Sequence, residues 1–203
     1  ALRSVAPLIV CGSTWPADER FLAKVRQHFK HVSSAKQATW IIVPHEPGPA
    51  AQRRLEHIFG SDLRILDPQS ATERPEPGCV YLLNQIGWLS RLYALAAAGW
   101  VGGGFGTGIH NVLEAAVYGK GVCFGPNYRK FFEAVELVEA NLAWSFDGPE
   151  AAAHQLSRLV TDADVQQQIA QQAVRFVKSR CGATHEILRW LEMQSIIETD
   201  SSI

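Results

Sequence analysis

Short apolar runs alternate with amphipathic stretches along the whole chain. The runs are four to six residues long and rich in Val, Ile, Leu and aromatic residues, at 7–11, 38–43, 63–66, 80–83, 121–124 and 142–146. Continuous apolar runs of this length are typical of strands buried on both faces of a parallel sheet. Between them, apolar residues recur at helical spacing, for example at Phe21, Leu22, Val25 and Phe29 after a start near Asp18. The alternation predicts an α/β fold, a Rossmann-like parallel sheet with helices on both faces.

Bulk composition excludes several classes of protein. The 203 residues suffice for one sizeable domain, and the net charge of −1 gives no basic footprint for nucleic acid. No apolar run approaches the roughly 18 residues that span a bilayer, so we expect no transmembrane segment. Four cysteines lack any Cys-x-x-Cys spacing, which predicts free thiols in a reducing compartment rather than disulfides or a metal site.

The two ends of the chain suggest a piece of a longer protein. The sequence has no initiator Met and reaches its first strand within a few residues. We therefore expect a fragment that lacks an N-terminal part. Residues 194–203 are polar and are expected to fray.

A glycine-rich stretch at 99–127 is the strongest candidate for a binding site. Five glycines fall within seven positions after an apolar run, at Gly102, Gly103, Gly104, Gly106 and Gly108. Glycine allows close approach of a ligand and positive φ, and a helix start behind it presents free N–H groups to an anion. We expect His110, Asn111 and Glu114 on the first turns of that helix, with Glu114 placed to accept from sugar hydroxyls. The spacing is neither the dinucleotide fingerprint nor a Walker loop, and a plain surface turn is the alternative.

Other polar residues follow neighbouring strands of the predicted sheet. Gly12, Ser13 and Thr14 come after the first strand, and His45 comes after the second. Ligands bind at the carboxyl ends of strands in open α/β sheets, so we expect these residues near the glycine stretch. The alternative for Ser13 and Thr14 is N-capping of the next helix, and for His45 a structural role. The basic residues within 127–130 could also meet a phosphate there, or simply begin a solvated helix.

The sequence resembles a known family at these motifs. The Gly-rich loop with His110-Asn-x-Leu-Glu114 and Phe124-Gly-Pro-Asn127, and the Gly12-Ser-Thr-Trp15 segment, are similar to the 3-deoxy-D-manno-octulosonic acid (Kdo) transferases. The similarity runs over most of residues 7–192. It implies that residues 1–193 are the C-terminal, donor-binding half of a GT-B glycosyltransferase. Its donor would be CMP-Kdo, and its acceptor a lipid A precursor bound by the absent N-terminal domain.

The resemblance also implies roles for individual residues. Donor contacts carry over to Gly12, Ser13, Thr14, Gly104, Gly106, Gly108, His110, Asn111 and Glu114. No metal or other cofactor is implied, and the general base would be a carboxylate of the absent domain, so no catalytic residue is assigned to this chain. Family members often carry Pro-Arg-His where this chain has Pro44-His-Glu46, and His45 is the candidate to replace that arginine. The whole enzyme would work at the cytoplasmic face of the bacterial inner membrane, with this fragment soluble.

Two other functions fit the same residues. One is a stand-alone nucleotide-sugar-binding module that uses these loops without catalysis. The other is a different GT-B glycosyltransferase or an epimerase-like protein that uses a UDP-sugar. Binding of CMP rather than UMP or UDP separates the CMP-Kdo hypothesis from the UDP-sugar one.

Overall fold

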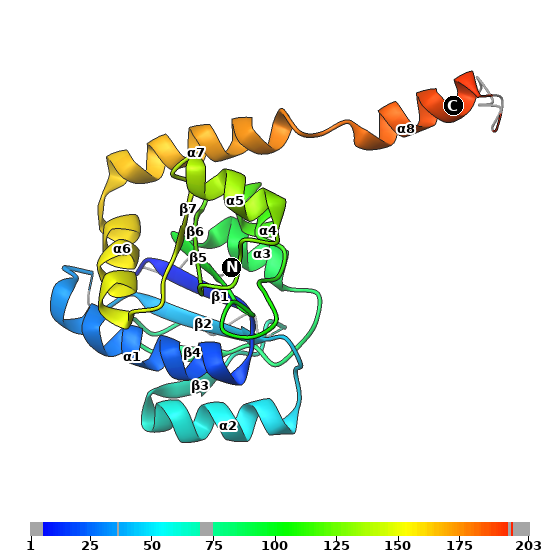
Figure 1. Ribbon diagram of the computed structural model, residues 1–203. Helices are drawn as coiled ribbons and strands as arrows, with labels where there is room; N and C mark the ends of the chain where they lie inside the picture. The colour runs from blue at the N-terminus through cyan, green and yellow to red at the C-terminus, as the bar shows by residue number, and fades with distance from the viewer. Residues whose placement is uncertain (1–5, 36, 70–74, 195, 197–203) are drawn as a thin grey trace.

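The chain forms one seven-stranded sheet in which each paired strand runs parallel to its neighbour (Figure 1). The computed structural model describes residues 6–35, 37–69, 75–194 and 196. The strand order is β3-β4-β2-β1-β5-β6-β7. Their bounds are β1 Leu8–Thr14, β2 Thr39–Pro44, β3 Leu63–Ile65, β4 Val80–Leu82, β5 Ala98–Val101, β6 Gly121–Phe124 and β7 Ala143–Ser145.

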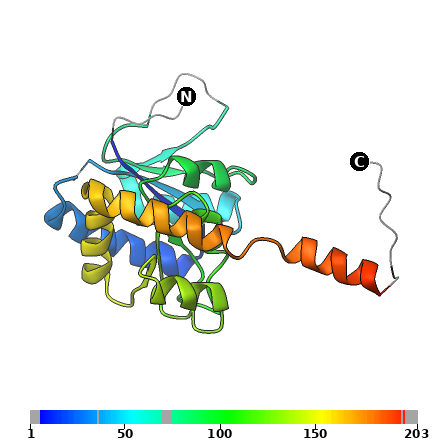
Figure 2. The ribbon, with the colours of Figure 1, turned by 90° about the horizontal axis from the view of Figure 1, so that it is seen from above.

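Helices cover both faces of this sheet, as the alternating pattern predicts. Their bounds are α1 Pro16–Val32, α2 Pro49–Phe59, α3 Leu89–Leu95, α4 Leu113–Ala116, α5 Phe132–Glu139, α6 Pro149–Thr161, α7 Ala163–Lys178 and α8 Ala183–Met193, with a 3-10 turn η1 at Gly60–Asp62. Helices α1 and α6 pack together on one face, and α3 and α4 lie on the other (Figure 2). The predicted α/β architecture is confirmed.

The direction in which successive strands are added to the sheet reverses beside β1. The chain moves outward from β1 to β2 and the far edge, then returns to place β5 on the other side of β1. In open α/β sheets ligands bind at such a switch point, outside the carboxyl ends of the strands. The residues that follow β1, β2 and β5 therefore meet at one edge of the sheet.

The central strands are buried on both faces, which explains their continuous apolar sequence. Ile9, Val10 and Cys11 of β1 and Trp100 of β5 have no exposed surface. At about 25 cal/mol per Å² of apolar surface removed from water, burial of such side chains is the main force that holds the sheet to its helices. All four cysteines are free, and burial raises the pKa of the Cys11 and Cys123 thiols. The prediction of free thiols is confirmed.

Two predicted helix starts are displaced. Helix α1 begins at Pro16 rather than Asp18, because proline suits the first turn, where its missing N–H is not needed. Helix α5 begins at Phe132 rather than Arg129, because the residues before it form a turn, with the Phe131 N–H donating to the Tyr128 carbonyl at 2.9 Å.

The C-terminal helix stands away from the rest of the molecule. Helix α7 buries Ile169 and Ala173, whereas α8 projects from the body and buries no residue (Figure 1). Of the predicted tail at 194–203, Gln194 and Ile196 alone lie within the described residues. Within the described ranges, no helix combines the length and the apolar character needed to cross a bilayer.

Candidate functional site at the carboxyl edge of the sheet

The loops after β1, β2 and β5 are joined by their backbones. The Gly102 N–H donates to the Gly12 carbonyl at 2.9 Å, and the His45 N–H donates to the Thr14 carbonyl at 3.0 Å. A side chain on Gly102 would collide with the Ser13 carbonyl, and a Cβ on Gly104 would lie 2.6 Å from the Gly125 nitrogen. These two glycines are therefore required for loop-to-loop packing, a role that the composition of the stretch does not reveal.

Ser13 and Thr14 do not cap the helix that follows them. Trp15 is the N-cap residue of α1, and Thr14 is a buried residue of β1 whose hydroxyl donates to Glu19 Oε1 at 3.4 Å. Ser13 has φ of +52°, in the left-handed region that is unusual for residues other than glycine. The capping alternative is therefore wrong, and both residues belong to the end of β1, where its register with β2 shifts.

A buried carboxylate, Asp18, connects the first loop to the glycine stretch. Its Oδ2 accepts from the backbone N–H groups of Trp15 and Gly103, each at 2.9 Å. Burial raises the pKa of Asp18, although these two hydrogen bonds and the Trp100 indole act in the opposite direction. Sequence analysis read Asp18 only as the start of a helix. An acidic residue three positions after an N-cap is the signal that could have found this contact.

Three aromatic rings from three different loops stack at this edge. The ring centroids of Trp15 and His45 are 4.8 Å apart, and those of His45 and His110 are 4.2 Å apart. The Trp15 indole Nε1 donates to His110 Nε2 at 2.9 Å. His110 Nε2 is therefore unprotonated and its proton sits on Nδ1. Burial, and then the neighbouring His45, lower the pKa of His110.

An arginine also reaches this edge, from α2. Arg54 donates to both oxygens of Glu19, from Nε at 2.5 Å and from Nη2 at 2.9 Å, and the Glu19 side chain has no exposed surface. This pairing raises the pKa of Arg54. Nothing in the sequence singles out Arg54, because it lies within a helix and its contact with Glu19 joins two different helices. Two N–H groups of its guanidinium therefore donate to the buried Glu19 carboxylate.

The expected helix start behind the glycines is corrected by the structure. Helix α4 has only four residues, so His110 and Asn111 precede it and Glu114 is its second residue. Such a short helix aligns few peptide dipoles, and the predicted attraction for an anion is correspondingly weak. The Asn111 Oδ1 accepts from the Leu113 N–H at 3.0 Å, which satisfies one of the helix-start donors.

Most N–H groups of the glycine loop already have acceptors inside the protein. The Gly106 and Gly108 N–H groups donate to the Gly103 carbonyl, and the His110 N–H donates to the Gly102 carbonyl. Within the described residues, the N–H groups of Asn111 and Val112 have no acceptor. The N–H groups of Gly104, Phe105, Thr107 and Ile109 likewise have no acceptor among the described residues, so the backbone donors left for an anion lie both in the glycine loop and at Asn111 and Val112.

Glu114 and Gly12 lie near the same buried tyrosine. Burial is the main cause of the raised pKa of Tyr93, and the charge of Glu114 adds to it. Burial also raises the pKa of Glu114 itself, which is half-buried. A Cβ on Gly12 would meet the side chains of Tyr93 and Leu89. The missing side chain of Gly12 therefore makes room for α3 rather than for a ligand.

Two cavities flank the glycine loop. The first, of about 380 Å³, is lined by Trp15, Pro16, Ala17, Arg20, Gly103, Gly106 and Thr107. The second, of about 400 Å³, is lined by Ile109, His110, Asn111, Val112, Leu113, Phe131 and Glu133. Both have the volume of a small-ligand pocket.

The glycines of the predicted site have different surroundings. Gly106, in the wall of the first cavity, has φ outside the left-handed region and room for a Cβ, whose nearest neighbour would be the Gly103 carbonyl at 3.6 Å. Gly108 has φ of +142° and lies against Phe131. Of the five glycines of the stretch, Gly103, with φ of +94°, and Gly108 therefore use the positive φ that glycine allows, whereas Gly102, Gly104 and Gly106 do not.

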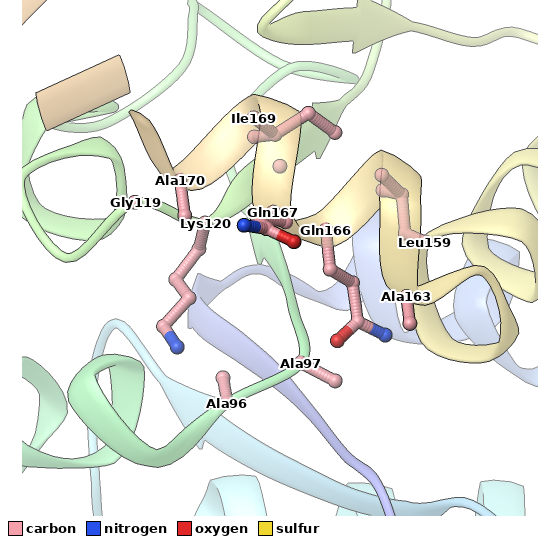
Figure 3. A pocket seen from close by; sticks show the side chains of 11 residues that line it. Ala96, Ala97, Gly119, Lys120, Leu159, Ala163, Gln166, Gln167, Ile169 and Ala170 are labelled. Atoms are coloured by element: carbon pink, nitrogen blue, oxygen red, sulfur yellow. The ribbon is translucent and has the colours of Figure 1, made fainter. Parts of the chain in front are cut away.

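A third cavity, of about 320 Å³, lies at the opposite edge of the sheet (Figure 3). The residues before β5 and β6 and the start of α7 line it, with the Lys120 side chain extending along one wall and Gln166 on the other. None of the predicted site residues lines it. In the part of the chain that the structure describes, no three His, Cys, Asp or Glu side chains form a group that could hold a metal ion.

Comparison with known proteins gives both sequence and fold relatives. No family model matches the chain. The chain is 26% identical over 129 residues to a 3-deoxy-D-manno-octulosonic acid transferase of Rickettsia bellii, an alignment that covers 61% of this chain and 29% of that protein. The chain therefore matches less than a third of this relative's length.

Solved structures share the fold over most of the chain. The C-terminal CMP-Kdo binding domain of WaaA from Acinetobacter baumannii superposes with a TM-score of 0.71 at 20% identity, covering 85% of this chain and 89% of that domain. WaaG, a glycosyltransferase involved in lipopolysaccharide biosynthesis, superposes with a TM-score of 0.57 at 13% identity, covering 89% of this chain and 45% of WaaG. The chain is thus similar in sequence to Kdo transferases, and its fold is that of one half of a GT-B glycosyltransferase.

Proposed function

We propose that this chain is the donor-binding domain of a glycosyltransferase that moves Kdo from CMP-Kdo to a lipid A precursor in lipopolysaccharide biosynthesis. One observation carries the proposal. The chain is similar in sequence to Kdo transferases, and it has the fold of a CMP-Kdo binding domain over nearly the full length of both. Larger GT-B proteins match at lower TM-scores and with less than half of their length.

In this proposal the donor lies at the edge where the β1, β2 and β5 loops meet. The phosphate of CMP lies near the unoccupied N–H groups of Asn111 and Val112 and near the stack of His45 and His110. The half-buried carboxylate of Glu114 accepts from the ribose hydroxyls. Ser13, Thr14 and Gly104 shape the floor of the site, and Gly106 and Gly108 its wall.

The reaction is a substitution at the anomeric carbon of Kdo. A hydroxyl of the acceptor forms the new C–O bond, the bond from that carbon to the phosphate oxygen breaks, and CMP leaves with the electron pair. N–H and imidazole donors at the phosphate stabilise the negative charge that develops on it. The proton of the acceptor hydroxyl goes to a general base on an N-terminal domain, which also binds the lipid acceptor.

In this proposal the present chain binds the CMP-Kdo donor, and the rest of a longer enzyme supplies the base that accepts the proton. The longer enzyme would work at the cytoplasmic face of the bacterial inner membrane, where its lipid acceptor is found. The chain alone is expected to bind the nucleotide and to leave the transfer reaction uncatalysed.

Calorimetric titration of the purified chain with CMP, UMP, AMP and UDP tests the proposal. We expect CMP to bind at least tenfold more tightly than the other three, a difference of about 1.4 kcal/mol. Preference for UDP would instead support a UDP-sugar enzyme of the same fold. Transfer of Kdo by the chain alone would contradict the assignment of the general base to another domain.

A further inference from the structure

We propose that Arg20 of α1 binds the phosphate of the nucleotide, together with backbone N–H groups of the glycine loop. This inference rests on the proposed function, because the phosphate concerned is that of CMP. It goes further by assigning the permanent positive charge of the site to a residue that lies outside the motifs of the sequence.

Arg20 shares the first cavity with the glycine loop. It lines this cavity of about 380 Å³ together with Gly103, Gly106 and Thr107 of the loop. Arg20 follows Pro16 by four positions, so both lie on one face of α1, and Pro16 lines the cavity as well. Within the part of the chain that the structure describes, Arg20 is the one charged side chain that lines this cavity.

The guanidinium of Arg20 is available to a ligand. Its side chain is exposed, and no carboxylate among the described residues forms an ion pair with it. The two acidic residues before it in α1 are buried and bonded elsewhere: Asp18 accepts from two backbone N–H groups, and Glu19 accepts from Arg54. Arginine keeps its charge at physiological pH, and its planar fork of N–H donors matches the oxygens of a phosphate.

The glycine loop offers backbone donors beside the same cavity. The N–H groups of Gly104, Phe105 and Thr107 have no acceptor among the described residues, and Thr107 itself lines the cavity. The backbone at Gly106 is open, since the nearest neighbour of an added Cβ would be the Gly103 carbonyl at 3.6 Å. A guanidinium and unpaired backbone N–H groups around one cavity are donors that suit a phosphate.

This cavity borders the place assigned to the nucleotide. Trp15 lines it and also donates its indole N–H to His110 Nε2 at 2.9 Å. A Cβ on Gly103 would lie 3.2 Å from His110 Cδ2. His110 in turn lines the second cavity, beside Asn111 and Val112, whose N–H groups are the other donors assigned to the phosphate. The two cavities therefore meet at His110.

Two other cations near the loop are placed less favourably for a ligand. Arg54 is paired with the buried Glu19 carboxylate. Lys130 lies against Gly108, where an added Cβ would be 2.7 Å from Lys130 Cε, and its Nζ is 5.3 Å from the centroid of the Phe131 ring. Lys130 lines neither of the two cavities beside the loop. We therefore expect Lys130 to contribute less to phosphate binding than a cation inside the first cavity.

Calorimetric titration of Arg20→Gln with CMP and with cytidine tests the assignment. We expect the variant to melt like wild type, because the Arg20 side chain is exposed. It should lose about ten- to a hundredfold in CMP affinity, the range for a hydrogen bond to a charged group. Cytidine has no phosphate, so its affinity, measured by displacement of CMP if direct titration is too weak, should change little. Arg20→Lys keeps the charge without the planar fork and should lose less than Arg20→Gln.

Two further variants carry the same change of charge elsewhere. Arg158→Gln, at an exposed position on α6, is the matched control and should bind CMP as wild type does. Lys130→Gln should lose less CMP affinity than Arg20→Gln, and a larger loss would contradict the assignment to Arg20. Equal losses for CMP and cytidine, or normal CMP affinity in folded Arg20→Gln, would overturn this inference and leave the proposed function standing. A wild-type chain that binds no CMP would overturn both.

Discussion

Glu114 is the acidic side chain on which the ribose contact depends in the proposed site. It is half-buried at the second position of α4, and burial raises its pKa. Burial therefore disfavours the negative charge of the Glu114 carboxylate, and a hydrogen bond from a ribose hydroxyl would stabilise that charge. We expect Glu114→Ala to weaken CMP binding by about 1.5–3 kcal/mol, the usual size of a hydrogen bond to a charged group. Titration calorimetry measures the loss.

Glu150→Gln gives the matched control, since Glu150 is exposed at the start of α6. It should leave CMP affinity unchanged. A Glu114→Ala variant with normal CMP affinity and a normal melting curve would assign Glu114 a purely structural role.

At the scale of elements, the glycine loop combines positions that pack with a position that faces a cavity. Gly104→Ala should destabilise the fold by a few kcal/mol, since the new Cβ would press on the Gly125 backbone. Gly106→Ala should melt like wild type, because only the Gly103 carbonyl lies near its new Cβ. Thermal unfolding of the two variants checks this contrast.

The larger Gly106→Val substitution then tests whether the loop holds the phosphate. It adds apolar bulk to the wall of the first cavity, and its Cβ makes only an ordinary van der Waals contact with the Gly103 carbonyl, at 3.6 Å. We expect folded Gly106→Val to lose affinity for CMP and to lose much less affinity for cytidine, which lacks the phosphate. Equal losses for the two ligands, or no loss for either, would remove the phosphate from this loop.

The ion pairs between α1 and η1 predict how the stability of the fold depends on pH. Asp62 Oδ2 accepts from Arg26 at 2.6 Å and from Lys30 at 3.2 Å, and the hydrogen bond from Arg26 is the main cause of the lowered pKa of Asp62. A folded-state pKa below the unfolded value of about 3.9 means that this stabilisation is complete above pH 4 and is lost as the pH falls through the folded value.

Asp62→Asn should therefore lower the melting temperature at pH 7, and the difference from wild type should disappear in acid. The Asp62 side chain is 45% exposed, so we expect a loss of only about 1 kcal/mol. Glu139→Gln, at an exposed position on α5 without such a pair, should show no comparable loss. An equal effect of Asp62→Asn at pH 3 and pH 7 would contradict the role of the ion pair.

At the scale of the whole molecule, the sheet and its covering helices are complete without α8. Helix α8 buries no residue, and Ile187, Trp190 and Met193 are among its exposed apolar side chains. The nearby Arg180 is still tied to the body through Glu136, at 2.8 Å, and through the Phe176 ring. Truncation after Cys181 should therefore leave the melting temperature and CMP affinity unchanged. A clear drop in either would show that α8 supports the body.

The sequence by itself determined the layers of the fold and the edge of the sheet at which the candidate site residues meet. Strands of a parallel sheet that are buried on both faces are apolar throughout, so β1, β2, β4 and β6 can be recognised in the sequence as continuous apolar runs. The carboxyl ends of parallel strands share an edge, so the residues after β1, β2 and β5 were expected to meet there. Helix boundaries such as those of α4 and α5 were missed, because local turns and caps compete with helical periodicity over a few residues.

Only the tertiary structure decided which contacts each residue of the candidate site makes within the protein. Gly12 and Gly104 make room for protein atoms, and Asn111 accepts from the first backbone N–H of α4, although all three fit a ligand-binding motif equally well. The contacts from Asp18 to Gly103 and from Trp15 to His110 join residues 85 and 95 positions apart. Such contacts depend on the order of strands in the sheet, and periodicity along the chain carries no information about distances across it.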